Sequence, residues 1–182
     1  MSSMVFALAG RRIDAAGAAN ATFPVENIGV VRNRLRALFE MHDGKALVSS
    51  AACGADLLAL EEAGALGMRR RVILPFTAER FRATSVVDRP GDWGPVYDRV
   101  IGEVSAHHDL VVFESDLADD EAYAAANHAI LDEAAMLSRE SGNRAAAVLA
   151  WDGHSRGDTD LTAAFGRQAR LRDMAVFDVT TL

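Results

Sequence analysis

The 182-residue sequence is poor in several features that would assign it to a specialised class of protein. It contains one cysteine, Cys53, which excludes an internal disulfide and a cysteine-only metal site. No apolar stretch approaches the length of a membrane span, and no basic segment followed by a long apolar run opens the chain. We therefore expect a cytoplasmic protein with no membrane contact, stabilised by a hydrophobic core.

Positive charge and metal-ligand patterns are also scarce. Lys and Arg number 19 against 26 Asp and Glu, which gives a net charge of −7, and the basic residues are dispersed along the chain. This balance argues against a nucleic-acid partner, which a basic stripe would attract. His107 and His108 are adjacent and would point in opposite directions, and the other histidines do not pair with them at ligand spacing. We expect no metal and no cofactor.

Apolar residues make up 50% of the chain, which is enough for one substantial core. The sequence has no internal repeat or low-complexity linker, so we predict a single domain over residues 1–182. Helical spacing of apolar residues alternates with short apolar runs, which indicate strands at 4–9, 46–48, 71–74, 110–113, 145–151 and 175–179. Apolar strands that alternate with helices are typical of a buried parallel sheet. We predict an α/β fold, a Rossmann-like doubly wound three-layer α/β/α sandwich with a mainly parallel sheet.

A loop of small residues follows the strand at 46–48 and opens directly into a helix. Small side chains let the backbone approach a ligand, and the first N–H groups of a helix attract anions. We predict that Ser49, Ser50, Cys53 and Gly54 contact a phosphate or a ribose. The alternative is a tight turn in which Cys53 is a buried filler, and Asp56 in the first helical turn would repel an anion.

A second small, polar loop, residues 151–159, also lies between a strand and a helix. Ligands of open α/β sheets bind at the carboxyl ends of the strands, so the two loops suggest one shared site. From this loop we predict ligand contacts by Gly153, Gly157, Asp158 and Thr159. A helix cap is the alternative role of Asp158 and Thr159.

The connection after the first strand supplies three further candidates, Gly10, Arg12 and Asp14. Arg12 can donate two hydrogen bonds to a phosphate, and Asp14 can accept one from a ribose hydroxyl, although a solvated arginine and a turn cap are equally ordinary. Residues 76–93 follow another strand end and show little apolar periodicity, so we expect a lid or an ordered connection. Trp93 would stack on a base or anchor the loop.

These segments together resemble the Smf/DprA–lonely guy superfamily (SLOG), a group of Rossmann-like nucleotide-binding domains, and the chain is most similar to its bacterial members. The resemblance rests on residues 9–14, the loop 49–56, Leu74-Pro75-Phe76 with Phe81, Ser85 and Val86, and Gly157-Asp158-Thr159. It implies binding of a nucleotide-like small molecule. The superfamily includes phosphoribohydrolases that cut the bond between base and ribose 5′-phosphate, a protein that holds single-stranded DNA, and sensors of nucleotide-derived signals. Fold membership does not select among these activities.

One motif departs from the phosphoribohydrolase pattern Gly-Gly-x-Gly-Thr-x-x-Glu, in which Gly-Thr holds phosphate and the glutamate assists cleavage. Here Asp158-Thr159 stands in place of Gly-Thr, and Thr162 stands in place of the glutamate. Glycosidic cleavage needs a carboxylate to stabilise oxocarbenium-like charge and to orient water. In an enzyme, Asp160 or Glu62 would take that role, which makes them the catalytic candidates.

Three functions follow as hypotheses. We favour binding or sensing of a nucleotide or nucleotide-derived ligand at the two loops and under residues 76–93. The enzymatic alternative is an N-glycosidase acting on nucleoside 5′-monophosphates or a dinucleotide. The third is a non-catalytic protein-interaction module. A homodimer is expected from the resemblance and from surplus apolar positions on the helices near residues 96 and 120. Holding of single-stranded DNA, which the resemblance also allows, conflicts with the acidic charge.

Overall fold

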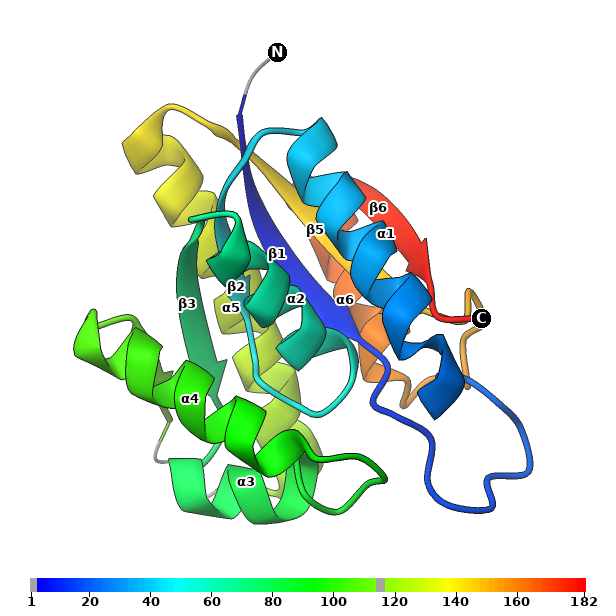
Figure 1. The fold of residues 1–182 in the computed structure, drawn as a ribbon. Helices are drawn as coiled ribbons and strands as arrows, with labels where there is room; N and C mark the ends of the chain where they lie inside the picture. The colour runs from blue at the N-terminus through cyan, green and yellow to red at the C-terminus, as the bar shows by residue number, and fades with distance from the viewer. Residues whose placement is uncertain (1–2, 114–116) are drawn as a thin grey trace.

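The computed structural model describes residues 3–113 and 117–182, and its centre is a six-stranded sheet (Figure 1). Each hydrogen-bonded pair of strands is parallel, and the spatial order is β4-β3-β2-β1-β5-β6. The strands are β1 (Met4–Gly10), β2 (Gly44–Ser49), β3 (Arg69–Leu74), β4 (Leu110–Val112), β5 (Arg144–Trp151) and β6 (Ala175–Thr180). All six predicted strands are present, and the predicted fold class is confirmed.

Helices cover both faces of the sheet. One face carries α1 (Ile28–Met41), α2 (Ala55–Ala65), α3 (Ala78–Ser85) and α4 (Trp93–Ala106). A short 3-10 helix, η1 (Val25–Asn27), directly precedes α1. The other face carries α5 (Asp119–Ser141) and α6 (Leu161–Leu171). Strand β1 is apolar throughout because both of its faces are buried. Phe6 and Leu8 lie under the first group of helices, whereas Val5 and Ala7 lie under the second.

Local sequence accounts for the apolar face of α1 and for two of the helix boundaries. In α1, Val31, Leu35 and Phe39 are buried at intervals of four residues and form a single apolar stripe. Asp160 caps the start of α6, since its carboxylate accepts hydrogen bonds from the backbone of the first turn. Gly142 follows the last residue of α5 and adopts the left-handed conformation at φ 68°.

The expected lid, residues 76–93, contains a regular helix. Its second residue, Thr77, caps α3 by accepting a hydrogen bond from the backbone N–H of Arg80 at 3.4 Å. Only Phe81 and Ser85 of α3 are buried, and a two-residue stripe is too weak to reveal a helix by periodicity. Within the described residues, none of the helices combines the length and apolar character needed to cross a membrane.

The strand order reverses between β1 and β5, since the chain adds β2, β3 and β4 on one side of β1 and β5 and β6 on the other. The two strands end level with each other, because Gly10 pairs with Ala150 in the register. A crevice at the carboxyl ends of the strands beside such a reversal is where open α/β folds bind ligands. The topology therefore points to the ends of β1 and β5.

Candidate functional site

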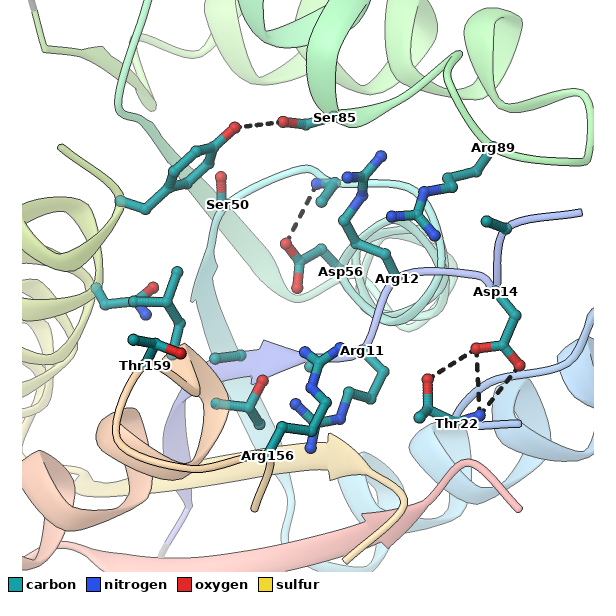
Figure 2. A pocket seen from close by; sticks show the side chains of 18 of the residues that line it. Arg11, Arg12, Asp14, Thr22, Ser50, Asp56, Ser85, Arg89, Arg156 and Thr159 are labelled. Carbon is teal, nitrogen blue, oxygen red and sulfur yellow. Dashed lines mark hydrogen bonds between the residues drawn. The ribbon is translucent and has the colours of Figure 1, made fainter. Parts of the chain in front are cut away.

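A cavity of about 640 Å³ opens at this strand-order reversal (Figure 2). The turn after β1, the loop after β2, the α3 segment, the first turns of α5 and the loop before α6 all contribute to its walls. Its polar lining residues are Arg11, Arg12, Asp14, Asn20, Thr22, Ser50, Asp56, Ser85, Arg89, Asp120, Tyr123, Asn127, Arg156, Thr159 and Thr162. The volume lies within the range of sites for small molecules and cofactors.

Arg11 joins the turn after β1 to the loop before α6. Its guanidinium donates hydrogen bonds of 2.9 and 2.8 Å to the two oxygens of Asp160, and a third of 2.7 Å to Asp152. Burial alone would raise the pKa of Asp160, but the bonds from Arg11 and from the backbone N–H groups of Arg156 and Ala163 outweigh it. They hold the pKa of Asp160 below its usual range. This ion pair joins the turn after β1 to the predicted loop 151–159.

Three other guanidinium groups line the cavity. Arg12 forms an ion pair with Asp88, and its guanidinium also lies beside the thiol of Cys53; its Nε atom is buried and completes no hydrogen bond of good geometry within residues 3–113 and 117–182. Arg89 donates a long hydrogen bond of 3.4 Å to the carbonyl of Ile13. Arg156 is exposed, with its Nε 3.7 Å from the carboxylate of Asp160. Arginine side chains grouped in this way favour an anionic ligand.

The loop after β2 divides between the cavity and the core. The Oγ atom of Ser50 is buried at the cavity wall and lacks a partner in the described part of the chain. Ser49 is buried and donates its hydroxyl hydrogen bond to the carbonyl of Ser50 at 2.8 Å. Cys53 is packed within the core, where burial raises the pKa of its thiol and Arg12 offsets only part of this effect. Cys53 therefore fits the buried-filler alternative.

Gly54 serves packing between two loops. Its φ of 94° is in the left-handed half of backbone space, and a Cβ atom would lie 2.8 Å from the backbone nitrogen of Ile13. The next residue, Ala55, donates its N–H to the carbonyl of Arg11 at 3.1 Å. The start of α2 is thus packed against the turn after β1. The N–H of Ala55, one of the first N–H groups of the helix that were predicted to bind an anion, is already hydrogen-bonded to Arg11.

Asp56, in the first turn of α2, faces the cavity with 7% of its surface exposed. Its Oδ2 atom accepts one hydrogen bond, of 3.2 Å, from the backbone N–H of Ala52. Burial raises the pKa of Asp56 to about 7, although the Ala52 hydrogen bond and the nearby Arg12 act in the opposite direction. Asp56 is therefore a carboxyl group that changes its charge near neutral pH.

The wall formed by α3 and α5 is mainly aromatic and hydrogen-bonding, with Asp120 at its start on α5 as a charged side chain. The hydroxyl groups of Tyr123 and Ser85 share a hydrogen bond of 2.6 Å, and the rings of Tyr123 and Phe81 lie 6.4 Å apart between centroids. Asn127 follows Tyr123 by one turn of α5 and also lines the cavity. The cavity thus has a charged wall near Arg12 and a wall suited to a planar, hydrogen-bonding group.

The structure brings five of the predicted ligand-binding residues to this cavity: Gly10, Arg12, Asp14, Ser50 and Thr159. The other seven do not line it: Ser49, Cys53, Gly54, Trp93, Gly153, Gly157 and Asp158. Trp93 is buried, and its indole N–H donates to the carbonyl of Pro90 at 2.9 Å, so it anchors the end of the lid segment. Gly153, Gly157 and Asp158 are exposed in the loop before α6.

Asp14 lines the cavity but is occupied by its own loop. Its carboxylate accepts hydrogen bonds from the backbone N–H of Thr22, from the Thr22 hydroxyl at 2.7 Å, and from the backbone N–H of Phe23 at 3.1 Å. The turn-capping alternative therefore describes these contacts. By closing residues 14–23 into a compact loop, Asp14 positions one side of the cavity.

Neither catalytic candidate lines the cavity. Asp160 is fully engaged by Arg11 and by the first backbone N–H groups of α6. Glu62 lies on α2 beside a separate hollow of about 560 Å³, where it forms ion pairs with Arg32 at 2.8 Å and Arg36 at 3.2 Å. Both carboxylates hold structural partners in this structure.

Sequence reasoning had not proposed several lining residues as ligand contacts, among them Asn20, Thr22, Arg89, Tyr123, Asn127 and Arg156. Arg89 and Arg156 stand in segments already selected, so a search for cations there would have found them. Tyr123 and Asn127 carried no signal, because α5 crosses to the site only in the folded chain. Over residues 3–113 and 117–182, no three His, Cys, Asp or Glu side chains are grouped to hold a metal ion.

Comparison with known proteins adds little detail. No protein-family profile and no curated protein sequence matches the chain. Among solved structures, it is similar to the X-ray structure of DNA processing protein A (DprA) from Streptococcus pneumoniae, with 13% sequence identity and a TM-score of 0.42. The similarity covers 98% of this chain and 59% of the DprA chain, so this chain spans less than two thirds of that protein's length.

Proposed function

We propose that this chain is a SLOG-type domain that binds a nucleotide or nucleotide-derived ligand in the cavity at the ends of β1 and β5. The phosphate lies near Arg12, Arg89 and Ser50, and the base lies toward Tyr123 and Asn127. This assignment retains the predicted ligand class. It moves the phosphate from Gly54 and Gly157, which do not line the cavity, to residues that do.

The observation that carries the proposal is a pair of buried polar atoms, Arg12 Nε and Ser50 Oγ, that complete no hydrogen bond of good geometry within the described residues, although the Cys53 thiol lies beside the Arg12 guanidinium. A buried donor that makes no hydrogen bond costs about 1–3 kcal/mol, so such atoms are rare unless something else completes them. Both residues line the same cavity, and a serine hydroxyl and a guanidinium group are both donors that suit a phosphate oxygen. A bound phosphate would recover this cost and would face the positive charge of Arg12 and Arg89.

The experiment is a thermal unfolding screen with AMP, ATP, NAD, ADP-ribose, cyclic AMP and inorganic phosphate. A ligand at ~100 times its dissociation constant adds about 2.7 kcal/mol, which should raise the unfolding midpoint by roughly 5–10 °C. Calorimetry with the best ligand then compares Arg12→Gln with Arg139→Gln, an exposed arginine at the far end of α5. We expect a loss of affinity of at least about tenfold in Arg12→Gln, since a charge-assisted hydrogen bond contributes about 1.5–3 kcal/mol, and wild-type affinity in the control.

Binding without chemistry is the form that we propose, because the two carboxylates considered for glycosidic cleavage are held in ion pairs. Incubation with each nucleotide followed by chromatography of free base tests this directly, and release of base would replace the proposal with the N-glycosidase hypothesis. A flat thermal screen would instead favour the interaction module. Light scattering would then determine whether the chain forms the expected homodimer.

A further inference from the structure

We propose that Asp56 binds the anionic ligand in its protonated form, as a hydrogen-bond donor, so that ligand binding is coupled to uptake of one proton by the protein. This inference rests on the proposed function and adds a specific role to a carboxyl group that seemed unfavourable for anion binding. Asp56 is buried in the wall of the cavity, in the first turn of α2, directly after the small-residue loop that follows β2 (Figure 2).

The hydrogen bonding of Asp56 leaves one oxygen available. The backbone N–H of Ala52 donates to Oδ2 at 3.2 Å, and the described residues provide no partner for Oδ1. The side chain is more than nine-tenths buried, yet it lines a cavity large enough for a nucleotide. A protonated carboxyl group in this position offers one O–H donor toward the cavity.

The cations around Asp56 are committed to other carboxylates. Arg11 pairs with Asp160 and Asp152, and Arg12 pairs with Asp88. Asp56 itself has no ion-pair partner within residues 3–113 and 117–182. An unpaired carboxylate is costly to bury, so proteins keep such a group neutral. This geometry agrees with the direction of its pKa, which burial raises to about 7.

Charged and titratable groups from each neighbouring element share the cavity with Asp56. They are Arg11, Arg12 and Asp14 after β1, Arg89 after α3, Asp120 and Tyr123 on α5, and Arg156 before α6. Of these, Arg12 is the one whose charge acts on the pKa of Asp56. Arginines stay charged throughout the neutral range, so Asp56 is the group whose titration changes the charge of this wall near pH 7.

The consequence for the ligand follows from the two charge states. Neutral Asp56 adds a third donor to the Ser50 hydroxyl and the Arg12 guanidinium, which line the same cavity, and all three groups suit the oxygens of a phosphate. Ionised Asp56 offers no donor and repels the same oxygens. Affinity for a phosphate-containing ligand is therefore high below the pKa of Asp56 and falls as the pH rises through it.

The test uses NAD, ADP-ribose or cyclic AMP, whichever binds best, because the charges of a pyrophosphate bridge and of a cyclic phosphodiester do not change between about pH 6 and about pH 8.5. For the wild-type protein we expect affinity to fall at least about tenfold over this range, since a group of pKa about 7 goes from mostly protonated to mostly ionised. Calorimetry of the wild-type protein in two buffers of different ionisation enthalpy should show proton uptake that approaches one per ligand above pH 7.

Two variants separate Asp56 from other titrating groups. Asp56→Asn keeps an oxygen for the Ala52 N–H and stays neutral, so its affinity should vary little with pH and should exceed that of the wild type at pH 8.5. Glu140→Gln removes an exposed carboxylate at the far end of α5 and should keep the wild-type dependence. Wild-type affinity that does not change with pH, or the same pH dependence in Asp56→Asn, would overturn this inference and leave nucleotide binding intact. Absence of binding to every nucleotide by both proteins would overturn the proposed function as well.

Discussion

Arg11 and Asp160 are paired by two parallel hydrogen bonds of 2.9 and 2.8 Å, although 149 positions separate them in the chain. Both side chains are buried, and together they connect the carboxyl end of β1 with the start of α6. Arg11 lines the proposed site and Asp160 holds its guanidinium in place from behind the cavity wall, so the integrity of the pair is a condition for the cavity.

Replacing Arg11 with methionine should leave the buried carboxylate of Asp160 without its cation. Removal of one partner from a buried ion pair typically costs about 3–5 kcal/mol of unfolding free energy. Urea denaturation measures this cost, and Arg139→Met, at an exposed position, should change the stability by less than about 0.5 kcal/mol. Equal stabilities of the two variants would show that the Arg11–Asp160 pair is not structural.

Acid should weaken the same pair. Because the folded pKa of Asp160 is below its usual range, its contribution to stability is present above the unfolded value near 4 and is lost as the pH falls below it. We expect the stability difference between the wild type and Asp160→Asn to be largest at pH 7 and to shrink between about pH 4 and about pH 2. Denaturant titrations at these pH values would reveal a constant difference if the carboxylate's charge were unimportant.

Asp56 should show the opposite dependence in the absence of ligand. Its pKa is raised to about 7 in the folded protein, so unfolding releases its proton and stability declines as the pH rises from about 4 to about 7. Asp56→Asn should therefore equal the wild type near pH 4 and exceed it at pH 8 by up to about 4 kcal/mol, because a tenfold change in a proton-binding constant corresponds to about 1.4 kcal/mol. Thermal unfolding at both pH values measures the stability difference between the two proteins. A variant that is less stable than the wild type at pH 8 would contradict the prediction.

Gly54→Ala should destabilise the protein by more than about 2 kcal/mol. The new Cβ atom would meet backbone atoms of Arg11 and Ile13 at 2.9 and 2.8 Å, in a residue with φ 94°. Gly102→Ala is the matched control, because Gly102 is within α4 and a Cβ atom there meets no heavy atom within 4 Å. Alanine is the better helix former, so this control should gain up to about 1 kcal/mol. Chemical denaturation that ranks the variants in reverse would refute the packing role of Gly54.

Asp14→Ala should loosen the loop that it caps and should reduce nucleotide affinity with it. Loss of the hydrogen bonds from Thr22 and Phe23 is expected to cost about 1–3 kcal/mol. Asp14→Asn retains one acceptor oxygen and should lose less. Hydrogen exchange of the Thr22 and Phe23 amides reports the loop directly, and unchanged protection in Asp14→Ala would contradict the role assigned to this carboxylate.

The fold could be predicted because its signals are local. The apolar runs of β1 and β5 show that these strands are buried on both faces, and their alternation with helical periodicity selects a parallel sheet. Helix α3 was missed, since Phe81 and Ser85 alone face the core and the rest of that segment is polar. A short helix held mainly by tertiary contacts leaves little trace in sequence periodicity.

The candidate site was predicted only in part. Arg12, Ser50 and Thr159 follow strands or precede helices, so the general rule about strand ends selects them, and they line the cavity. The same rule also selected Cys53 and Gly54, which the fold uses for packing. Sequence position identifies the end of the sheet but not the direction in which each side chain points.

The sequence by itself determined the fold class and the edge of the sheet at which a ligand is expected, because burial and strand direction leave local patterns in the chain. Only the tertiary structure decided which side chains meet there. It paired Arg11 with Asp160, turned Glu62 toward Arg32 on another face, and brought Tyr123 from α5 to Ser85. It also made Asp56 a buried carboxyl group that has no ion-pair partner in the described part of the chain, since desolvation depends on what surrounds a group and not on its neighbours in sequence.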